Sequence, residues 1–160
     1  ADELSSRSIR SQVLDGDLIR RTVCRDLGFS REDRVENIRR IMFIADLLTR
    51  NGVVAIIAVI SPYRSGRTEA RALIGRFVEV YVKASLEVLK ARDVKGMYQK
   101  AMTGQIMNFT GISDPYEEPE APEVLVDTEE QSPEESLGRL VAALKKLNLL
   151  RGTDKEKLIG

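Results

Sequence analysis

The fold of this chain is decided by residues 13–40, which read VLDGDLIRRTVCRDLGFSREDRVENIRR. Gln12–Leu14 predict a short strand, and the Asp-Gly-Asp sequence after it has the composition of a sharp turn. Between Arg20 and Arg40 the segment carries seven arginines against four carboxylates. Guanidinium groups suit phosphate and sulfate because they donate two parallel hydrogen bonds. The arginine excess beside the turn carboxylates therefore predicts a site for a polyanionic ligand next to a metal ion.

A helix and a buried strand follow the turn. Ser30 with Asp33 three residues later is typical of a helix start, apolar residues then recur at helical spacing, and Asn51-Gly52 predicts the helix end. Val53–Ile60 is apolar throughout, which predicts a central parallel strand covered on both faces. Ligands bind open α/β sheets at the carboxyl ends of such strands.

The rest of the chain continues the alternation of helices and strands. Strands alternating with helices predict an α/β fold, with a parallel sheet flanked by helices, and the length of 160 residues predicts a single domain over 1–160. Residues 93–122 lose the apolar periodicity and hold three of the five prolines, which predicts a mobile lid. The remaining predicted elements are a helix over 68–74, a strand over 77–82, a helix over 85–92, a strand over 124–126 and a closing helix over about 133–150.

The composition limits the chemistry. Basic and acidic residues balance at 25 each, so no global field favours nucleic acid or a membrane surface. No apolar run approaches the ~18 residues of a membrane span, no signal peptide is visible, and Cys24 is the single cysteine, which together predict a cytoplasmic protein. The sequence contains no histidine, which excludes Ser-His triads and imidazole bases. Phosphoryl transfer fits, because it depends mainly on positioning and charge neutralisation.

Candidate residues cluster in the opening segment. Asp15 and Asp17 could hold Mg²⁺ or receive a proton, although the same sequence is equally typical of a plain turn. Arg34 and Asn37 lie three residues apart and hence on one helix face, with Arg20 just after the turn. Each arginine alone is also consistent with a solvated helix surface.

Further candidates lie downstream. Ser61 follows the apolar strand, where it could equally be a turn residue before a proline. Phe29 and Phe109 stand in polar surroundings, where each could stack on a purine or anchor its loop in the core. Arg92 and Lys95 could reach phosphates from the predicted lid.

These stretches together resemble the adenylylsulfate kinase (APS kinase) family. They come in the family's order and cover most of the chain. The segments that carry the resemblance are LDGDLIR (14–20), DLGFSREDRVENIRRI (26–41), ISPYR (60–64), RDVKGMY (92–98) and NFTGISDPYEEPEAPE (108–123).

The resemblance implies a P-loop NTPase fold and an ATP-dependent phosphotransferase. The enzyme would use Mg²⁺ and transfer the ATP γ-phosphoryl group to the 3′-hydroxyl of adenosine 5′-phosphosulfate (APS), giving PAPS for sulfate assimilation. By similarity, Asp17 is the candidate base, and Asp15 supports the metal or the turn. Ser61 matches a serine that is described as a phosphoenzyme site in some members. The family is commonly dimeric and is sometimes fused to ATP sulfurylase.

The resemblance also implies two binding regions. The residues that would bind APS, including the phosphosulfate clamp and the adenine sandwich, are Asp15, Asp17, Arg20, Phe29, Arg34, Asn37, Ile60, Ser61, Lys95, Asn108 and Phe109. Arg92 would lie near the ATP. Two of the positions differ from the common family pattern, with Leu18 in place of asparagine and Asn108 in place of glycine.

The family's Walker A loop, G-x-x-x-x-G-K-[ST], does not occur in these 160 residues. We expect the loop to precede Ala1 in the parent protein and the 160 residues alone to lack turnover. Two alternatives follow: a non-catalytic domain that binds APS or a nucleotide, and a P-loop kinase for another small hydroxyl substrate.

Overall fold

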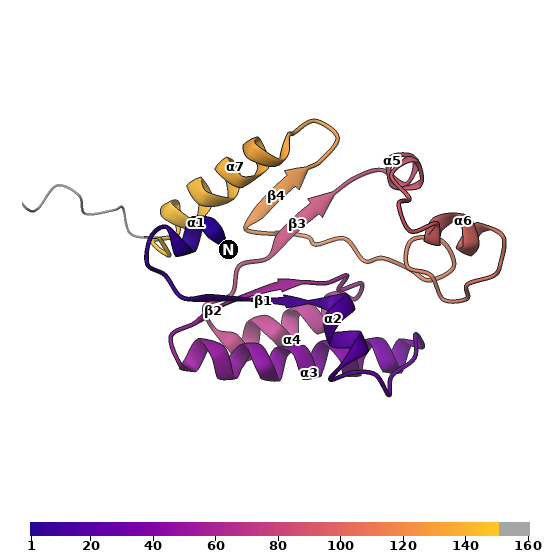
Figure 1. The fold of residues 1–160 in the computed structure, drawn as a ribbon, viewed down its shortest axis with the longest axis horizontal. Helices are drawn as coiled ribbons and strands as arrows, with labels where there is room; N and C mark the ends of the chain where they lie inside the picture. Colours follow the sequence, from indigo (N-terminus) through magenta and orange to yellow (C-terminus); the bar gives the residue numbers. More distant parts are fainter. Residues whose placement is uncertain (151–160) are drawn as a thin grey trace, which may run out of the picture. The chain divides into compact units, whose positions relative to one another are not determined.

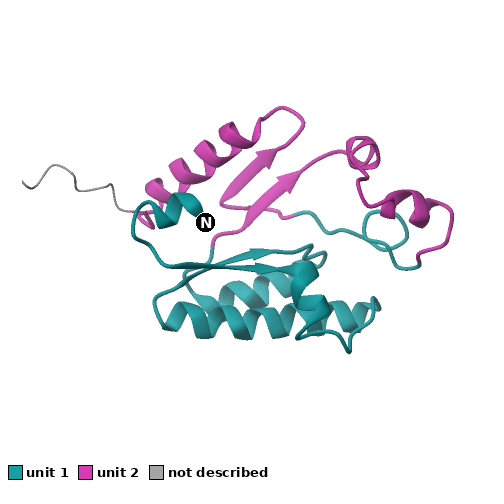
Figure 2. Cartoon of the chain, in the orientation of Figure 1, with its two compact units in different colours: residues 1–77, 107–118 teal, residues 78–106, 119–160 magenta. Residues whose placement is uncertain are grey.

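The computed structural model describes residues 1–150, which divide into two compact units (Figures 1 and 2). The first unit comprises Ala1–Phe77 and Met107–Glu118, and the second comprises Val78–Ile106 and the residues from Pro119 onward. The predicted lid over 93–122 is therefore shared between the two units. Among the described residues, no helix is long and apolar enough to cross a membrane.

The first unit is built on two parallel strands, β1 (Ser11–Asp15) and β2 (Val54–Ala58). Helices α3 (Arg31–Arg50) and α4 (Arg64–Ile74) pack against each other and lie on one face of this sheet (Figure 1). The short helices α1 (Asp2–Ser5) and α2 (Gly16–Arg21) flank β1 in sequence.

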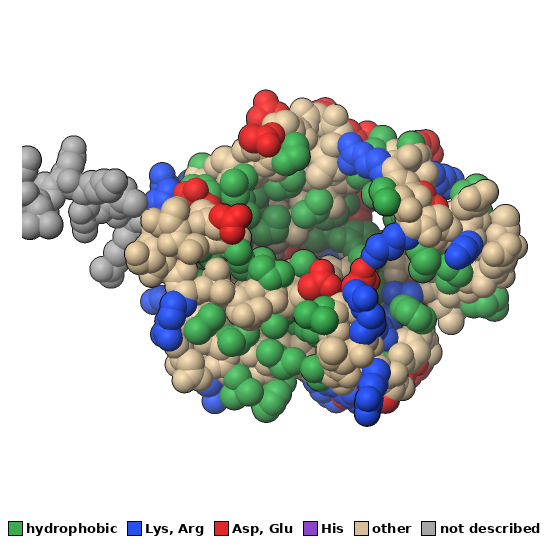
Figure 3. Space-filling model, viewed as in Figure 1, with side chains coloured by type: hydrophobic (Ala, Val, Ile, Leu, Met, Phe, Trp, Pro, Cys, Tyr) green, Lys and Arg blue, Asp and Glu red, His purple; other side chains and the backbone are tan. Residues whose placement is uncertain are grey.

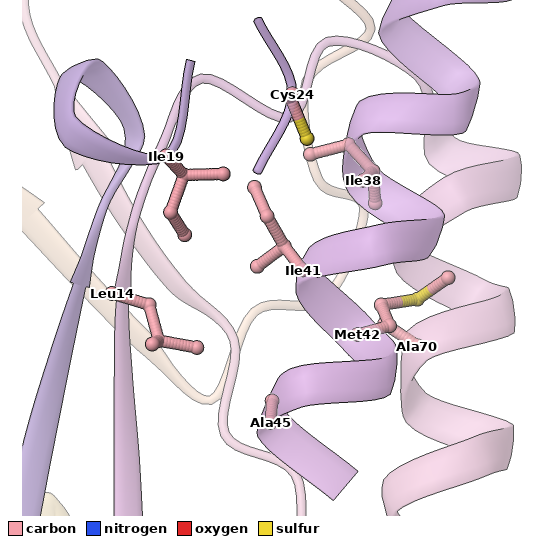
Figure 4. Close-up of a cluster of buried hydrophobic side chains, with 8 residues drawn as sticks. All are labelled: Leu14, Ile19, Cys24, Ile38, Ile41, Met42, Ala45 and Ala70. Atoms are coloured by element: carbon pink, nitrogen blue, oxygen red, sulfur yellow. The ribbon is translucent and has the colours of Figure 1, made fainter. Parts of the chain in front are cut away.

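The core of this unit lies between the sheet and its two long helices (Figure 4). Ile41 and Cys24 are almost completely buried, with exposed fractions of 1% and 0%. The other buried members of the cluster are Leu14, Ile19, Ile38, Met42, Ala45 and Ala70. The interpretation of Cys24 as a packing residue agrees with this burial.

Local signals set the ends of α3. The Ser30 side chain accepts a hydrogen bond from the Asp33 amide, as the sequence predicts. The helix ends at Arg50, and Gly52 adopts a φ of 68°, a left-handed conformation that favours glycine.

The second unit also has two parallel strands, β3 (Val80–Lys83) and β4 (Val124–Asp127). Helix α7 (Pro133–Lys146) packs on β4 and begins with a complete capping box between Ser132 and Glu135. Helices α5 (Leu86–Ala91) and α6 (Met97–Met102) complete this unit.

Several predictions of detail are wrong. Every residue of β2 is at least partly exposed, so Val53–Ile60 is not a strand covered on both faces; within its unit, both long helices lie on one face. Helices α2 and α6 fall in stretches predicted as a turn and an irregular lid, because six-residue helices are too short to show a periodicity. Strand β3 begins at Val80 rather than at residue 77, α4 begins at Arg64, and α7 ends at Lys146.

Candidate functional site

The site begins where β1 ends. Asp15 closes the strand, and its Oδ1 accepts a hydrogen bond of 2.9 Å from the Leu18 amide, so the predicted turn is the capped start of α2. A Cβ on Gly16 would lie 3.0 Å from Val59 Cγ1 and 3.2 Å from the Ala58 carbonyl, so this position needs glycine for the close approach of β2. Asp17, in the first turn of α2, is exposed. The carboxyl end of β1 and the first turn of α2 therefore present two carboxylates.

Arg20 joins α2 to the segment before α3. Its Nη1 donates to the Gly28 carbonyl at 2.6 Å, and its guanidinium lies 4.9 Å from the centroid of the Phe29 ring. Burial is the main cause that lowers the pKa of Arg20 from its ordinary value. The ring of Phe29 is itself 59% exposed. An aromatic face beside a partly desolvated cation is thus available to a ligand.

Arg34 connects two segments that are far apart in sequence. Its Nε donates to the Phe29 carbonyl at 3.1 Å, its Nη1 donates to Thr110 Oγ1 at 2.9 Å, and its Nη2 donates to the Asn108 carbonyl. The guanidinium also lies 5.8 Å from the Phe29 ring centroid. The predicted anion clamp therefore also holds protein segments together.

Asn37 is the one polar residue among the fully buried side chains of residues 1–150, with an exposed fraction of 6%. Its Oδ1 has no hydrogen-bond partner within that part of the chain. A buried amide oxygen without a donor costs about 1–3 kcal/mol. A ligand that donates a hydrogen bond to Oδ1 would remove this cost.

Phe109 lies on a loop that is closed by its own hydrogen bonds. Its carbonyl accepts from the amides of residues 112, 113 and 114, and its amide donates to Ser113 Oγ at 2.9 Å. The preceding Asn108 has a φ of 55°, which asparagine tolerates better than most residues. Through Arg34, the structure brings this loop to the segment of Phe29.

Two predicted residues follow the other strand of the sheet. Ile60 is 65% exposed, and the carbonyl of Ser61 accepts a 2.6 Å hydrogen bond from Arg67 Nη1. Because β1 and β2 are parallel neighbours, Ile60 and Ser61 leave the same sheet edge as Asp15 and Asp17.

Arg92 and Lys95 belong to the second unit. Arg92 donates to Thr128 through both Nη atoms, at 3.0 Å to Oγ1 and 2.7 Å to the carbonyl. Lys95 is exposed on the loop between α5 and α6. Residues of the same two helices line a cavity of about 420 Å³, and neither Arg92 nor Lys95 is among its lining residues. These two predicted residues thus share one unit, and the other ten lie in the first unit.

Sequence reasoning missed a second polar layer beneath the clamp. Tyr63 is buried, and its hydroxyl donates to Asp114 Oδ2 at 2.9 Å. Burial, and then this hydrogen bond, raise the pKa of Tyr63 from its ordinary value. Asp114 Oδ2 also lies 3.9 Å from Arg34 Nε. Tyr63 and Asp114 stand in the quoted segments ISPYR and NFTGISDPYEEPEAPE, but nothing in their spacing indicates that they meet.

The residues present offer limited metal ligation. Residues 1–150 contain no cluster of three or more side chains of the kinds that commonly bind metals. The carboxylates at the end of β1 can still serve Mg²⁺, which keeps several waters and needs only one or two protein carboxylates beside substrate phosphates.

Fold and site together define a class of protein. A parallel strand that ends in carboxylates, with arginines and an exposed aromatic ring beside it, is typical of α/β proteins that bind a nucleotide anion. Both basic and acidic side chains lie on the face drawn in Figure 3, in keeping with the 25 basic and 25 acidic residues of the sequence.

Comparison with known proteins gives the family. The family model for adenylylsulphate kinase matches residues 1–127. An adenylyl-sulfate kinase of Synechococcus sp. (strain JA-2-3B'a(2-13)) is 52% identical over 145 residues, covering 91% of this chain and 83% of the relative. A probable bifunctional SAT/APS kinase of Sorangium cellulosum is 52% identical over 145 residues, 91% of this chain and 25% of its own length. The chain belongs to the adenylylsulphate kinase family.

Solved structures agree. The APS kinase CysC of Mycobacterium tuberculosis in complex with AMPPNP and APS is 36% identical, with a TM-score of 0.85 over 90% of this chain and 85% of that chain. A hexameric APS kinase from Thiobacillus denitrificans is 33% identical, with a TM-score of 0.70 over 94% of this chain and 26% of that chain. These matches confirm the predicted α/β fold of the P-loop NTPase class, and they favour a kinase over the non-catalytic alternative.

Proposed function

We propose that this chain transfers the γ-phosphoryl group of ATP to the 3′-hydroxyl of APS, giving PAPS and ADP. The observation that carries the proposal is the group formed by Arg20, Arg34, Asn37 and the exposed Phe29 ring at one sheet edge. A purine attached to a phosphosulfate matches a site that combines an aromatic face with guanidinium groups. The complex of the M. tuberculosis relative with APS supports this choice of ligand.

In the proposed complex the phosphosulfate binds Arg20, Arg34 and Asn37. The contacts of Arg34 within residues 1–150 use three of the five N–H groups of a guanidinium, which leaves two for the anion. The Nδ2 of Asn37 can donate to the anion, whereas its unpaired Oδ1 is an acceptor and would be satisfied by a donor on APS, such as a hydroxyl or the adenine amino group. Phe29 and Phe109 stack on the adenine, and Ile60, Ser61 and Asn108 line the same site.

Asp17 is the proposed general base. Its exposed carboxylate accepts the proton of the 3′-hydroxyl, the oxygen bonds to the γ-phosphorus, and the bond from that phosphorus to the β,γ-bridging oxygen breaks to release ADP. Bound Mg²⁺ would neutralise phosphate charge, held through water by Asp17 and by the Asp15 oxygen that does not cap α2. Ser61, which matches a serine described as a phosphoenzyme site in some family members, is proposed as a second catalytic residue.

As the resemblance implies, Arg92 is proposed for the ATP side and Lys95 for binding APS, although Arg92 also anchors the Thr128 segment. The Walker A sequence is not among the 160 residues, so we expect these residues alone to bind APS without turning over ATP.

Self-association and fusion belong to the same proposal. Homodimers are expected from the family, and the hexamer and the SAT/APS kinase named above show that relatives do assemble and fuse. Light scattering of the purified chain would measure its mass in solution.

A turnover assay tests the function. The chain, preceded by a segment with the Walker A sequence, is incubated with ATP, Mg²⁺ and APS, and PAPS is separated by chromatography. Adenosine and simple sugars, tested in parallel as acceptors, address the remaining alternative of another small hydroxyl substrate. PAPS formation with strong preference for APS is expected, and an enzyme that phosphorylates adenosine or a sugar as well as APS would contradict the proposal.

A further inference from the structure

Arg34 holds the two aromatic segments of the site at once. One guanidinium donates to the carbonyl of Phe29 and to the carbonyl of Asn108, the residue directly before Phe109. A third hydrogen bond, 2.9 Å to Thr110 Oγ1, fixes the other side of Phe109. Because an arginine fork is planar, its orientation sets the separation of the backbone groups that it binds. The spacing between the backbone segments that carry Phe29 and Phe109 therefore depends on the orientation of Arg34.

Two further residues could set that orientation. Asp114 Oδ2 lies 3.9 Å from Arg34 Nε and accepts the Tyr63 hydroxyl at 2.9 Å. The side chains of Arg34 and Asp114 are only 13% and 18% exposed, so the interaction between them is weakly screened. Tyr63 is 4% exposed, and the guanidinium of Arg31 lies 4.8 Å from its ring centroid.

Asp114 also belongs to the loop that carries Phe109. Its amide donates to the Phe109 carbonyl at 3.0 Å, and its carbonyl accepts the Gly111 amide at 2.8 Å. The carboxylate of the same residue reaches Tyr63, which directly precedes α4 and follows β2. Asp114 thus links the Phe109 loop both to the clamp on α3 and to the end of the sheet.

We propose that Asp114, held by the Tyr63 hydroxyl, is a positioning residue that orients Arg34 and thereby sets the aromatic slot for the adenine of APS. This inference rests on the proposed function, since it assumes that APS is the acceptor. Neither residue needs to touch the ligand. Their effect reaches the ligand through Arg34 and through the backbone of the Phe109 loop.

The proposal separates recognition of the base from recognition of the anion. Neutralising Asp114 loosens the slot and weakens stacking, but it also removes a negative charge beside Arg34. Attraction of the guanidinium for an anion should therefore stay equal or increase. General destabilisation of the protein would not lower the affinity for the purine-containing ligand while leaving the affinity for the anion unchanged.

Calorimetric binding to the 160-residue chain tests this inference without needing turnover. The variants are Asp114→Asn and Tyr63→Phe, each of which keeps the size of the side chain. Asp46→Asn is the matched control, because Asp46 pairs with Arg50 at 2.9 Å at the far end of the same helix. APS is titrated directly, and inorganic pyrophosphate is titrated in competition with APS as a probe for the anion alone. Circular dichroism and thermal unfolding report whether each variant folds.

We expect the dissociation constant for APS to be roughly tenfold larger in Asp114→Asn, and to increase by a smaller factor in Tyr63→Phe. The affinity for pyrophosphate should be unchanged or higher in both variants. Asp46→Asn should bind both ligands as the original chain does. Unchanged APS affinity in both folded variants overturns the inference, and so does a parallel loss of APS and pyrophosphate. If Asp114→Asn fails to fold, the same two outcomes are decided on Tyr63→Phe alone. Failure of the unaltered chain to bind APS would instead contradict the proposed function.

Discussion

Asn37→Leu should make the unliganded protein more stable and remove its affinity for APS. Asn37 is 6% exposed, and its buried Oδ1 has no partner among residues 1–150. An unsatisfied buried group of this kind costs about 1–3 kcal/mol, and leucine has the same number of side-chain heavy atoms without a polar group to bury. After allowing for imperfect packing of the branched side chain, we expect a gain of about 1–2 kcal/mol in the free energy of unfolding. In a domain of this size each kcal/mol raises the Tm by about 2–4 °C.

Urea unfolding and calorimetric titration with APS measure the two effects on the same samples. Gln131→Leu is the matched control, because Gln131 Oε1 is also buried without a partner in the described chain but belongs to the second unit. The control should gain stability and keep its APS affinity. A leucine variant at position 37 that is less stable than the original chain and binds APS equally well would refute the argument that this amide is kept for a ligand.

Three further predictions concern single side chains. In the chain extended by a phosphate loop, Asp17→Asn should lower the rate of PAPS formation by ~10²-fold or more, and a near-full rate would assign the base elsewhere. Ser132→Ala removes the cap of α7 and should lower the free energy of unfolding by about 1 kcal/mol in urea, with no change in APS affinity. Tyr63 has a raised pKa in the folded state, so its contribution to stability is present below its ordinary value of 10 and is lost as the pH rises through the folded value. Tyr63→Phe should flatten the alkaline fall in Tm, and an unchanged pH profile would contradict this.

The parts of the fold that sequence predicted are those with strong local signals. Ser30 and Asp33 start α3, Ser132 starts α7, and both helices lie close to their predicted ranges because caps and periodicity act within a few residues. The short helices α2 and α6 were missed because neither has a strong local signal. The hydrogen bond by which Asp15 caps α2 is one that a plain turn would also form. The burial of β2 was overestimated because the apolar sequence of a strand does not indicate which of its faces helices cover.

The candidate site also has parts that the sequence predicts and parts that it does not. The candidate residues could be named from their types, because arginines, carboxylates and an asparagine that share one helix and turn suit an anion, and their contact with a ligand stays a prediction. Their partners were not predictable from spacing. Tyr63 and Asp114 are 51 positions apart, and only the folded chain places the hydroxyl 2.9 Å from the carboxylate. A sequence therefore identifies groups that meet a ligand more readily than groups that hold those groups in place.

In the proposed site Arg34 both binds the ligand and holds other protein groups in place. This double role explains why the position suits arginine and not lysine. A lysine ammonium is a single point with three donors, and it could replace either the hydrogen bonds to the protein or the contact with an anion. The guanidinium carries five N–H groups in a plane, so three can bind the Phe29 carbonyl, the Asn108 carbonyl and Thr110 while two remain for a ligand. A ligand that binds the free edge of such a group meets donors already fixed by the protein, and it loses less entropy on ordering them. In the proposed site, the contacts that hold Arg34 to the protein thus also prepare its two remaining N–H groups for an anion.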